Sequence, residues 1–306
     1  MKVKIRIGNE VKEYTGAWEE HTLLEVFQEL GITQVHAPCG GNGTCKKCLV
    51  TVEGLGEVLS CQTQCKDDMC VTVAEEQKSA IAENGNCYLY PADAGEGLLA
   101  ACDIGTTTVV CHLLDGATGV RLCTVSAPNA QRSFGADVIS RIQASLDSGL
   151  DKLQSAIVDQ INGMLVQLKQ KAGRTEDIRR LAVAGNTVMS HLFCGLSPES
   201  IGVAPFTPLS LFGESYDAKQ IGIEGCETVY VVPSIAGYVG GDIVADLAAV
   251  QMHSSVLAED GEKETLLLDI GTNGEMVLGK SGSYVCCATA AGPAFEGAEI
   301  AMGMPA

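Results

Sequence analysis

Three cysteines near the amino end of the chain are spaced like the ligands of a metal ion or an iron–sulfur cluster. Cys39, Cys45 and Cys48 follow the pattern C-x5-C-x2-C. Three of the four residues after Cys39 are glycines. Glycine adopts positive φ easily, so the loop can curl around an inorganic core and direct its N–H groups at the sulfur atoms. The segment is therefore suited to one-electron transfer through an iron–sulfur cluster.

The fourth ligand must come from further along the chain. The spacing resembles that of vertebrate-type and bacterial [2Fe-2S] ferredoxins, in which a Leu-Ala-Cys-Gln segment carries the last ligand. Cys61 lies in the similar segment Val-Leu-Ser-Cys-Gln-Thr, and we predict that it completes the set. Cys65 and Cys70 remain alternatives. Only 12 residues separate Cys48 from Cys61, so we expect a peripheral helix of those ferredoxins to be missing.

Two other metal sites could use part of this pattern. Cys45-x2-Cys48 alone is also half of a zinc knuckle, but the chain has no second C-x2-C pair and zinc does not need a glycine-rich loop. A Rieske centre needs two histidine ligands, and only His36 lies near the cysteines. The [2Fe-2S] cluster is the interpretation that uses all of these residues.

A second chemical signal occurs twice, in Asp103-Ile-Gly-Thr-Thr-Thr108 and Asp269-Ile-Gly-Thr-Asn-Gly-Glu275. Each follows an apolar strand pattern and precedes another. An aspartate at a strand end can hold a hydrated Mg²⁺, while Gly105 and Gly271 allow close approach and the Thr hydroxyl and N–H groups that follow donate to phosphate oxygens. Two such hairpins facing each other would hold a nucleotide's phosphates from both sides. The alternative is a pair of ordinary β-turns.

Two other segments resemble phosphate sites on weaker grounds. Gly274 to Ser281 satisfies the pattern G-x4-G-K-S, but it reads as strand, turn and strand, whereas a P-loop leads into a helix. We take this match as chance. Gly185-Asn186-Thr187 follows a buried strand pattern and precedes a helix, so it is either an anion site or an ordinary helix cap.

The elements that must position the cysteine loop form a small amino-terminal domain. Residues 2–7 and 11–15 alternate like a strand pair, and Thr22 to Glu25 is a capping-box pattern that opens a helix ending at Gly31. Strand-like segments follow at 49–52, 58–61 and 71–73. This succession predicts an α+β, β-grasp, ferredoxin-like domain over 1–75. Residues 76–97 lose periodicity and read as a linker.

The remainder of the chain alternates strands and helices. We predict strands at 98–103, 107–114 and 181–185, and helices at 137–146, 151–171 and 187–194. This alternation predicts an α/β domain with a first lobe over 98–264, and the second Asp-Ile-Gly-Thr segment opens a further part over 265–306.

Composition limits the function. The chain has 306 residues, 46% of them hydrophobic and 19% charged, and a net charge of −18. Nucleic-acid binders need clustered positive charge, so we expect no nucleic-acid partner. No apolar run of about 18 residues and no signal peptide is apparent. The lack of such a run favours no membrane attachment. Most of the 14 cysteines stand singly in apolar stretches, which favours a reducing cytoplasm.

The paired Asp-Ile-Gly-Thr segments resemble the phosphate 1 and phosphate 2 motifs of the acetate and sugar kinase, heat-shock chaperone and actin superfamily. Joined to a ferredoxin domain, they make the chain similar to the reductive activators of corrinoid proteins. Further matching segments are Asn129–Gln131, Gly135–Arg141, Gly185–Thr187, Val203–Pro208, Gly240–Asp242 and Ala291–Gly297. They span almost the whole chain.

The resemblance implies a ribonuclease-H-like, actin-type ATPase domain and an activity. Electrons would pass from a low-potential donor through the cluster to Co(II) of a corrinoid protein, giving the Co(I) state that a methyltransferase needs. ATP would shift this uphill step, with Asp103 and Asp269 organising Mg²⁺. A homodimer is possible. The implied phosphate ligands are Thr106, Thr107, Thr108, Thr272 and Asn273, with Gly105, Gly185, Asn186, Thr187 and Gly271 lining the same site.

The chain departs from its relatives in one respect. After Asp269 only a hairpin or two remains, so we expect an incomplete, truncated second lobe, and the enzyme activity is then a property of the full-length form. An electron-carrying or regulatory module with a remnant, non-hydrolytic ATPase domain is the main alternative. A small-molecule kinase with the cluster as a redox sensor ranks lowest, because no sugar or acetate pocket signature is apparent.

Overall fold

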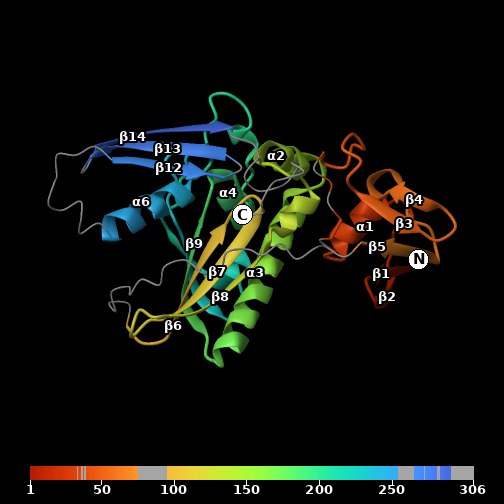
Figure 1. Ribbon diagram of the computed structural model, residues 1–306, viewed down its shortest axis with the longest axis horizontal. Helices are drawn as coiled ribbons and strands as arrows, with labels where there is room; N and C mark the ends of the chain where they lie inside the picture. Colours follow the sequence, from red (N-terminus) through yellow and green to blue (C-terminus); the bar gives the residue numbers. More distant parts are fainter. Residues whose placement is uncertain are drawn as a thin grey trace. The chain divides into compact units, whose positions relative to one another are not determined.

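The computed structural model describes residues 1–32, 34, 35, 37, 39–74, 95–253, 265–271, 273–280 and 283–290. They belong to two compact units, which Figure 1 shows with their elements labelled. Unit 1 comprises Met1–Ser79 with Ala130–Ala156, and unit 2 comprises Ala80–Asn129 with Ile157–Ala306. Among the described residues, no helix has the length and apolarity needed to cross a bilayer.

Unit 1 contains a five-stranded sheet in the order β2-β1-β5-β3-β4. Its strands are β1 (Lys2–Ile7), β2 (Glu10–Thr15), β3 (Leu49–Val52), β4 (Gly56–Leu59) and β5 (Met69–Val73). β1 pairs antiparallel with β2 and parallel with β5, so the first and last strands lie side by side. This is the predicted β-grasp architecture.

Helix α1 (Leu23–Glu29) supplies the other half of the unit 1 core. Its predicted capping box is confirmed: the Glu25 N–H donates to Thr22 Oγ1 at 3.3 Å, and the Thr22 N–H donates to Glu25 Oε2 at 2.6 Å. The helix buries Leu23, Val26 and Phe27, each at 0% exposure. Together with the inward residues of the sheet and Trp18, these side chains form one cluster.

The rest of unit 1 is largely helical. It contains η1 (Ser60–Gln62), η2 (Ala130–Ser133), α2 (Val138–Asp147) and the first turns of α3 (Leu150–Ala172). Asp137 caps α2, because its carboxylate accepts from the Ser140 N–H at 2.7 Å. The predicted helices at 137–146 and 151–171 therefore both exist, with bounds shifted by a residue at most.

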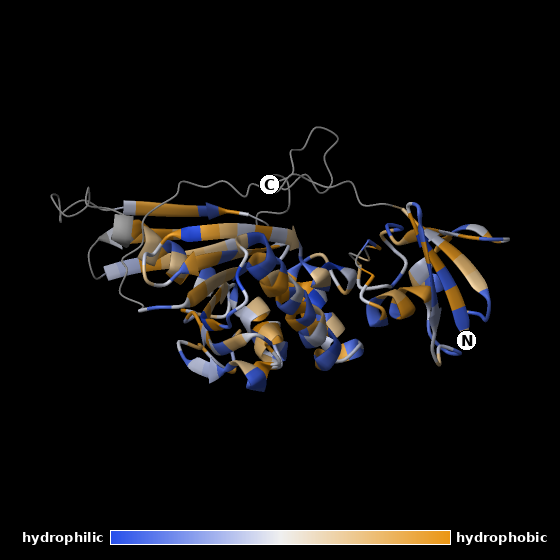
Figure 2. Cartoon of the chain, turned by 90° about the horizontal axis from the view of Figure 1, so that it is seen from below, coloured by the Kyte–Doolittle hydropathy of each residue, from blue (hydrophilic) through white to orange (hydrophobic). Residues whose placement is uncertain are grey.

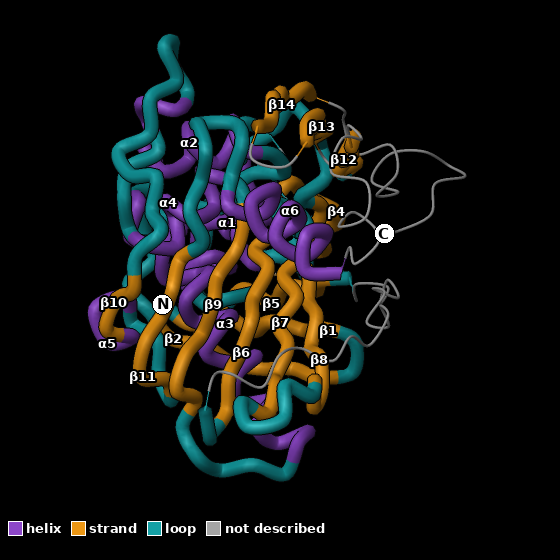
Figure 3. The backbone as a smooth tube through the Cα atoms, turned by 90° about the vertical axis from the view of Figure 1, so that its left-hand side faces the viewer, coloured by secondary structure: helices purple, strands orange, loops and turns teal. Residues whose placement is uncertain are grey.

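Unit 2 contains a six-stranded sheet in the order β10-β11-β9-β6-β7-β8, whose strands Figure 3 shows side by side. They are β6 (Leu98–Ile104), β7 (Thr108–Asp115), β8 (Arg121–Pro128), β9 (Ile178–Gly185), β10 (Ser215–Asp217) and β11 (Cys226–Val231). β6, β7 and β8 form an antiparallel meander, and β9 is parallel to β6 and β11. This agrees with the predicted α/β ribonuclease-H-like class.

The helices of unit 2 connect these strands. They are the remainder of α3, α4 (Thr187–Cys194), η3 (Glu199–Ile201), α5 (Ala218–Ile221) and α6 (Gly241–His253). Buried thiols fill gaps in this core, with Cys102 at 3% and Cys111 at 0% exposure on facing positions of β6 and β7. They were expected to stand singly, but the Cys111 thiol donates to Cys102 Sγ at 2.9 Å, because strand pairing brings the two positions together. The cysteines of the described residues are all free.

A second, three-stranded sheet of unit 2 is the antiparallel meander β12 (Thr265–Ile270), β13 (Asn273–Lys280) and β14 (Ser283–Ala290). One face packs on α6 through Ile243, Leu247, Leu267 and Val277. Figure 2 shows how hydrophobic its strands are. Gly274 to Lys280 lie within β13, which pairs antiparallel with β14, so the described part of the apparent P-loop pattern is strand, as argued from the sequence.

The buried face of α1 makes the stability of unit 1 sensitive to one side chain. Phe27→Ala should lower the free energy of unfolding by about 3–5 kcal/mol, because it leaves a cavity at a fully buried site. Trp18, the single tryptophan, is 1% exposed in the same core, so its fluorescence during urea unfolding measures the effect. Leu55→Ala, at a residue that is 58% exposed, is the control. Equal losses in both variants would contradict this account of the core.

Candidate functional site

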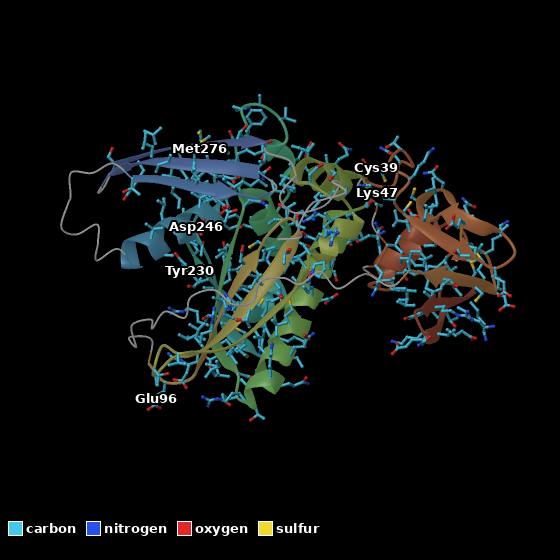
Figure 4. The ribbon with its side chains drawn as sticks, in the orientation of Figure 1. Cys39, Lys47, Glu96, Tyr230, Asp246 and Met276 are labelled. Carbon is cyan, nitrogen blue, oxygen red and sulfur yellow. The ribbon has the colours of Figure 1, made fainter. Side chains whose placement is uncertain are left out.

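The four predicted cluster cysteines lie together in two close pairs. Cys39 Sγ is 3.2 Å from Cys45 Sγ, and Cys48 Sγ is 3.2 Å from Cys61 Sγ. Three of them come from the glycine-rich loop, where Figure 4 labels Cys39, and Cys61 comes from η1. The Ser60 N–H donates to the Cys48 carbonyl at 2.9 Å, which holds η1 against the end of the loop.

The structure places Cys61, and neither of its two rivals, beside Cys48. Cys65 is buried at 2% exposure, and its N–H donates to the His21 carbonyl at 2.8 Å. Cys70 lies within β5, in register with Lys4 of β1. His36, the residue considered for a Rieske centre, lies outside the described residues.

The glycines of the loop have the conformation that their spacing predicts. Gly40, Gly41 and Gly43 have φ of 67°, 87° and 81°. A Cβ at Gly43 would lie 3.1 Å from Gln62 Cδ, and the Gln62 Nε2 group donates to the Gly41 carbonyl at 3.0 Å. The side chain after Cys61 thus supports the loop that carries the other three cysteines.

Hydrogen bonding to sulfur opposes the cost of burial at Cys39. Burial alone raises the pKa of the Cys39 thiol, but N–H groups of Cys45, Gly41 and Gly43 and the Cys45 thiol favour the thiolate and lower the pKa to about 6. At Cys61, burial and then the neighbouring Cys48 raise the pKa to about 11. If all four cysteines were ionised, their negative charges would repel one another, so the thiolate form of the whole set needs a positive charge beside it.

The grouping of the thiols distinguishes between possible metals. A single zinc ion needs four ligands around one point. Within the described part of the chain, no three Cys, His, Asp or Glu side chains converge on such a point. Two separate pairs of thiols suit two irons that share bridging sulfide, with two cysteines bound to each iron. The donor set thus fits a [2Fe-2S] cluster better than zinc.

The first Asp-Ile-Gly-Thr segment forms a tight hairpin between β6 and β7. Asp103 is the second-last residue of β6, and a Cβ at Gly105 would lie 2.7 Å from the Thr108 carbonyl oxygen. The Asn129 amide donates to the Gly105 carbonyl at 2.7 Å, and the Asn129 N–H donates to the Thr107 carbonyl at 2.9 Å. The close contact of Gly105 with Thr108 and the two hydrogen bonds from Asn129 therefore hold the turn in place.

Gly185, Asn186 and Thr187 lie directly beside this hairpin. Gly185 is the β9 partner of Ile104, and the Asn186 Nδ2 group donates to Thr106 Oγ1 at 3.0 Å. Asn186 Oδ1 accepts from the Met189 N–H at 3.0 Å, so this residue caps α4. The buried Thr187 hydroxyl donates to the Ala236 carbonyl at 2.6 Å. Of the two interpretations left open, the structure shows the cap, and it links that cap to the hairpin between β6 and β7.

The second hairpin joins β12 to β13 in the same unit. Asp269 is in register with Glu275, and the Gly271 N–H donates to the Asn273 carbonyl at 2.9 Å. Thr272 lies outside the described residues.

Three acidic residues that were not predicted as site residues lie near the two predicted aspartates. They are Asp242 and Asp246 of α6 and Glu275 of β13. Asp242 and Asp246 are four residues apart on one helix, so they share a face, and Glu275 has the same strand register as Asp269. Figure 4 labels Asp246 on α6. In the sequence, the four-residue spacing of Asp242 and Asp246 and the place of Glu275 just after the Asp269 turn were the signals that could have identified these residues.

The five carboxylates oppose one another's ionisation. Asp103 reaches solvent, yet protein surrounds most of its carboxylate, and this desolvation raises its pKa to about 7 with help from Asp242, Asp246 and Asp269. Desolvation first, and then repulsion within the group, raises the pKa of Asp242 and Asp246 to about 6 and that of Glu275 to about 7. A cation would relieve this repulsion. Carboxylate oxygens are the ligands that Mg²⁺ prefers, and this ion commonly keeps several of its water ligands.

Family models match three parts of the chain. A model described as the RACo middle region matches residues 98–255, and one described as the C-terminal domain of RACo, the ASKHA domain, matches residues 263–306. A 2Fe-2S iron-sulfur cluster binding domain matches residues 8–76.

Individual proteins are similar over much of the chain. The corrinoid activation enzyme RamQ of Eubacterium limosum is 30% identical, over 94% of this chain and 61% of its own. A [Co(II) methylated amine-specific corrinoid protein] reductase of Methanosarcina barkeri is 28% identical, over 67% and 38%. A solved structure described as a reductive activator for corrinoid, iron-sulfur protein is 29% identical, covers 99% of this chain and 65% of that one, and has a TM-score of 0.61. The chain thus spans less than two thirds of these relatives.

The raised carboxylate pKa values predict how stability depends on pH. Each group binds its proton more tightly folded than unfolded, so the folded form holds more protons between about pH 4 and pH 7 and loses stability as pH rises through that range. Asp246→Asn should therefore flatten the fall in unfolding free energy between about pH 4 and pH 7, as measured by urea unfolding without divalent cations. The control Glu227→Gln, at an exposed residue, should leave the slope unchanged. An unchanged slope in Asp246→Asn would show that folding does not raise the pKa of this carboxyl group.

Proposed function

Because the chain belongs to the RACo family of reductive activators of corrinoid proteins, we propose that it passes electrons through a [2Fe-2S] cluster to the Co(II) of a corrinoid protein, in an ATP-dependent step. The product would be the Co(I) state that a corrinoid-dependent methyltransferase uses. The observation that carries the proposal is the presence of two paired sets of thiols and a carboxylate-lined phosphate hairpin in one chain.

The residues of unit 1 would bind the cluster in a defined way. Cys39 and Cys45 would hold one iron, and Cys48 and Cys61 the other, as their pairing suggests. The N–H groups of Gly41 and Gly43 would donate to Cys39 and stabilise the reduced, more negative form. When bound, such a cluster supplies one-electron transfer at a potential near −400 mV in plant-type ferredoxins.

ATP would be needed because Co(II)/Co(I) is a low-potential couple. For a one-electron step, each 59 mV or so of unfavourable potential costs about a factor of ten in the equilibrium constant. Binding and hydrolysis of ATP in unit 2 would supply the free energy. Asp103 and Asp269 would hold a hydrated Mg²⁺, and Asp242, Asp246 and Glu275 would orient its water ligands.

The hairpins would bind the phosphates of the nucleotide. Thr106 Oγ1 accepts from Asn186, which fixes the direction of its hydroxyl, and Gly105 lets the turn approach closely. The proposed phosphate-binding residues are Gly105, Thr106, Thr107, Thr108, Gly185, Asn186, Thr187, Gly271, Thr272 and Asn273, of which Thr187 would act through its N–H group because its hydroxyl donates to Ala236.

The second candidate function is an electron-carrying or regulatory module without ATP hydrolysis. The observation that favours it is that the paired thiols, Cys39 with Cys45 and Cys48 with Cys61, lie wholly within unit 1 and would carry an electron without any nucleotide chemistry. In both functions the partners would be a corrinoid protein and a low-potential electron donor in the cytoplasm. Only in the ATP-dependent activator would cobalt reduction need a nucleotide that can be hydrolysed.

Substitution of the cysteines tests the cluster and the activity together. After anaerobic reconstitution, Cys61→Ser should lose the visible absorption and most of the iron, and should not reduce a Co(II) corrinoid protein in the presence of a reduced donor and Mg–ATP. Cys65→Ser, four residues away and also buried, should keep both. Iron analysis and the optical spectrum of cobalt provide the measurements. A colourless wild type, or loss of the cluster in Cys65→Ser only, would refute the ligand assignment.

Nucleotide binding tests the role of Asp103. Asp103→Asn should weaken the binding of Mg–ADP at least about tenfold in calorimetry. The same change should stabilise the folded protein at pH 8, because it removes one of the repelling charges. A variant that binds Mg–ADP more weakly but unfolds less easily than wild type is correctly folded, so its loss of affinity cannot come from misfolding. Glu227→Gln again serves as the control, and unaltered affinity in Asp103→Asn would rule out its contact with Mg²⁺.

A further inference from the structure

The side chain of Gln62, next to the proposed ligand Cys61, makes a set of hydrogen bonds to which the proposed function gives no role. Its Nε2 group donates to Cys61 Sγ at 3.5 Å, to the Gly41 carbonyl at 3.0 Å and to the Cys61 carbonyl at 3.2 Å. Gly41 belongs to the loop that carries Cys39 and Cys45. A single amide therefore contacts both the sulfur of the fourth ligand and the loop of the other ligands.

The neighbours of this amide determine which of its polar atoms faces the sulfur. The nitrogen and the oxygen of a glutamine side chain have nearly the same shape and are told apart by their hydrogen-bond partners. The carbonyl oxygens of Gly41 and Cys61 only accept hydrogen bonds, so the NH₂ group must face them. The same NH₂ group reaches Cys61 Sγ, which therefore receives a donor.

Packing against the glycine loop holds the amide in this place. A Cβ at Gly43 would lie 3.1 Å from Gln62 Cδ and 3.2 Å from both Cγ and Nε2. A Cβ at Gly41 would lie 3.8 Å from Cys61 Cβ, so the loop backbone also approaches the fourth ligand closely. Gln62 is an exposed residue, yet its amide is confined between the loop and the sulfur.

A donor to a ligand sulfur acts differently on the two oxidation states of a cluster. Reduction adds one negative charge to the irons and their sulfurs, so a hydrogen bond from an N–H group stabilises the reduced state more than the oxidised one. Hydrogen bonds to charged acceptors are also the stronger ones. The Gln62 amide has two protons for three acceptors, so a more negative sulfur attracts a larger share of its donation.

The reduction potential has opposite effects on the two halves of the proposed reaction. A higher potential makes it easier to take up an electron from a donor. It also lowers the equilibrium constant for passing that electron to Co(II), by about a factor of ten for each 59 mV or so. A hydrogen bond to Cys61 Sγ thus favours the first half at the expense of the second.

We propose that Gln62 is a positioning residue that raises the reduction potential of the cluster by donating a hydrogen bond to the sulfur of Cys61. It thereby sets the balance between electron uptake from the donor and electron delivery to cobalt. One electron enters and one leaves, Co(II) becomes Co(I), and Gln62 itself transfers no proton. The inference rests on the proposed function, because it requires Cys61 to bind iron of a [2Fe-2S] cluster.

Removal of the donor is the first test. Gln62→Met keeps an unbranched side chain against Gly43 but cannot donate. After anaerobic reconstitution it should lower the equilibrium constant for cluster reduction by about three- to tenfold, which is about 30–60 mV for one electron. Gln62→Glu replaces the donor by an acceptor and should lower the constant further. A redox titration followed by visible absorption measures both, at iron contents equal to that of the wild type.

Gln64 provides matched controls, because it is an exposed glutamine two residues further along the chain. Gln64→Met and Gln64→Glu make the same changes of size and charge without the contact to Cys61 Sγ. Both should keep the equilibrium constant for reduction within about twofold of the wild type. A Gln62 that only braced the loop would change how long the cluster is retained, but it would not change the potential.

A measurement on the wild type does not depend on the variants holding a cluster. In reduced protein that carries ¹⁵N in its glutamine side-chain amides, pulsed electron paramagnetic resonance should detect a ¹⁵N nucleus coupled to the cluster. Gln64→Met should keep this coupling. Its presence supports the proposal even where Gln62→Met takes up no iron.

The outcomes separate the role of Gln62 from the proposed function. An unchanged potential in Gln62→Met with full iron content, or no ¹⁵N coupling in the reduced wild type, would overturn the role of Gln62 and leave the proposed function intact. Equal shifts in the Gln62 and Gln64 variants would also overturn it, because the effect would not need the contact to sulfur. If the wild type binds no iron on reconstitution, the proposed function fails and this inference fails with it.

Discussion

Repulsion between like charges that are held close together is the constraint on which both candidate sites depend. In unit 1, four thiols lie in two pairs, and a neighbouring sulfur raises the pKa of Cys61 beyond what burial alone does. In unit 2, desolvation and then mutual repulsion raise the pKa of carboxylates on β6, α6 and β13, and Asp269 of β12 adds to that repulsion. Neither arrangement is favourable when fully ionised and without a counter-charge. Each is therefore built for positive charge that the polypeptide itself does not provide.

Backbone geometry keeps these groups together despite their repulsion. The cysteine loop follows a path that only glycine adopts easily at Gly41 and Gly43, and the amide of Gln62 holds it from outside. The first phosphate hairpin is held by Asn129 and by the close approach of Gly105 to Thr108. Both loops connect elements of sheets whose buried strands provide most of the stability. The loops themselves therefore need to contribute little to the free energy of folding.

The parts of the structure that could be predicted from sequence are those in which local pattern and chemistry agree. The capping box at Thr22 and the β-grasp succession followed from local spacing, and the association of Cys61 with Cys48 followed from the likeness of its segment to one that carries the last ligand in ferredoxins. β8 and β10 were not predicted, because Arg121–Pro128 mixes polar and apolar residues and Ser215–Asp217 is only three residues long. Pairing with β7 and β11 makes them strands, and pairing partners are not visible in a local window.

The carboxylates of α6 show a different limit. Asp242 and Asp246 are spaced like solvated residues of any helix, and only the tertiary approach of α6 to β12 and β13 gives them partners. Thr187 shows the reverse case. Its position after a strand suggested a phosphate donor, but its hydroxyl bonds to a carbonyl 49 residues away, which no spacing rule predicts.

Both polar atoms of the Asn186 side-chain amide make hydrogen bonds. Its oxygen holds the start of α4 and its nitrogen holds the Thr106 hydroxyl. An aspartate of the same shape could replace only the first of these bonds, since it lacks the donor. The start of α4 and the turn between β6 and β7 are therefore linked through a single planar group, so a tilt of the helix acts on the Thr106 hydroxyl and a shift of the turn acts on the helix.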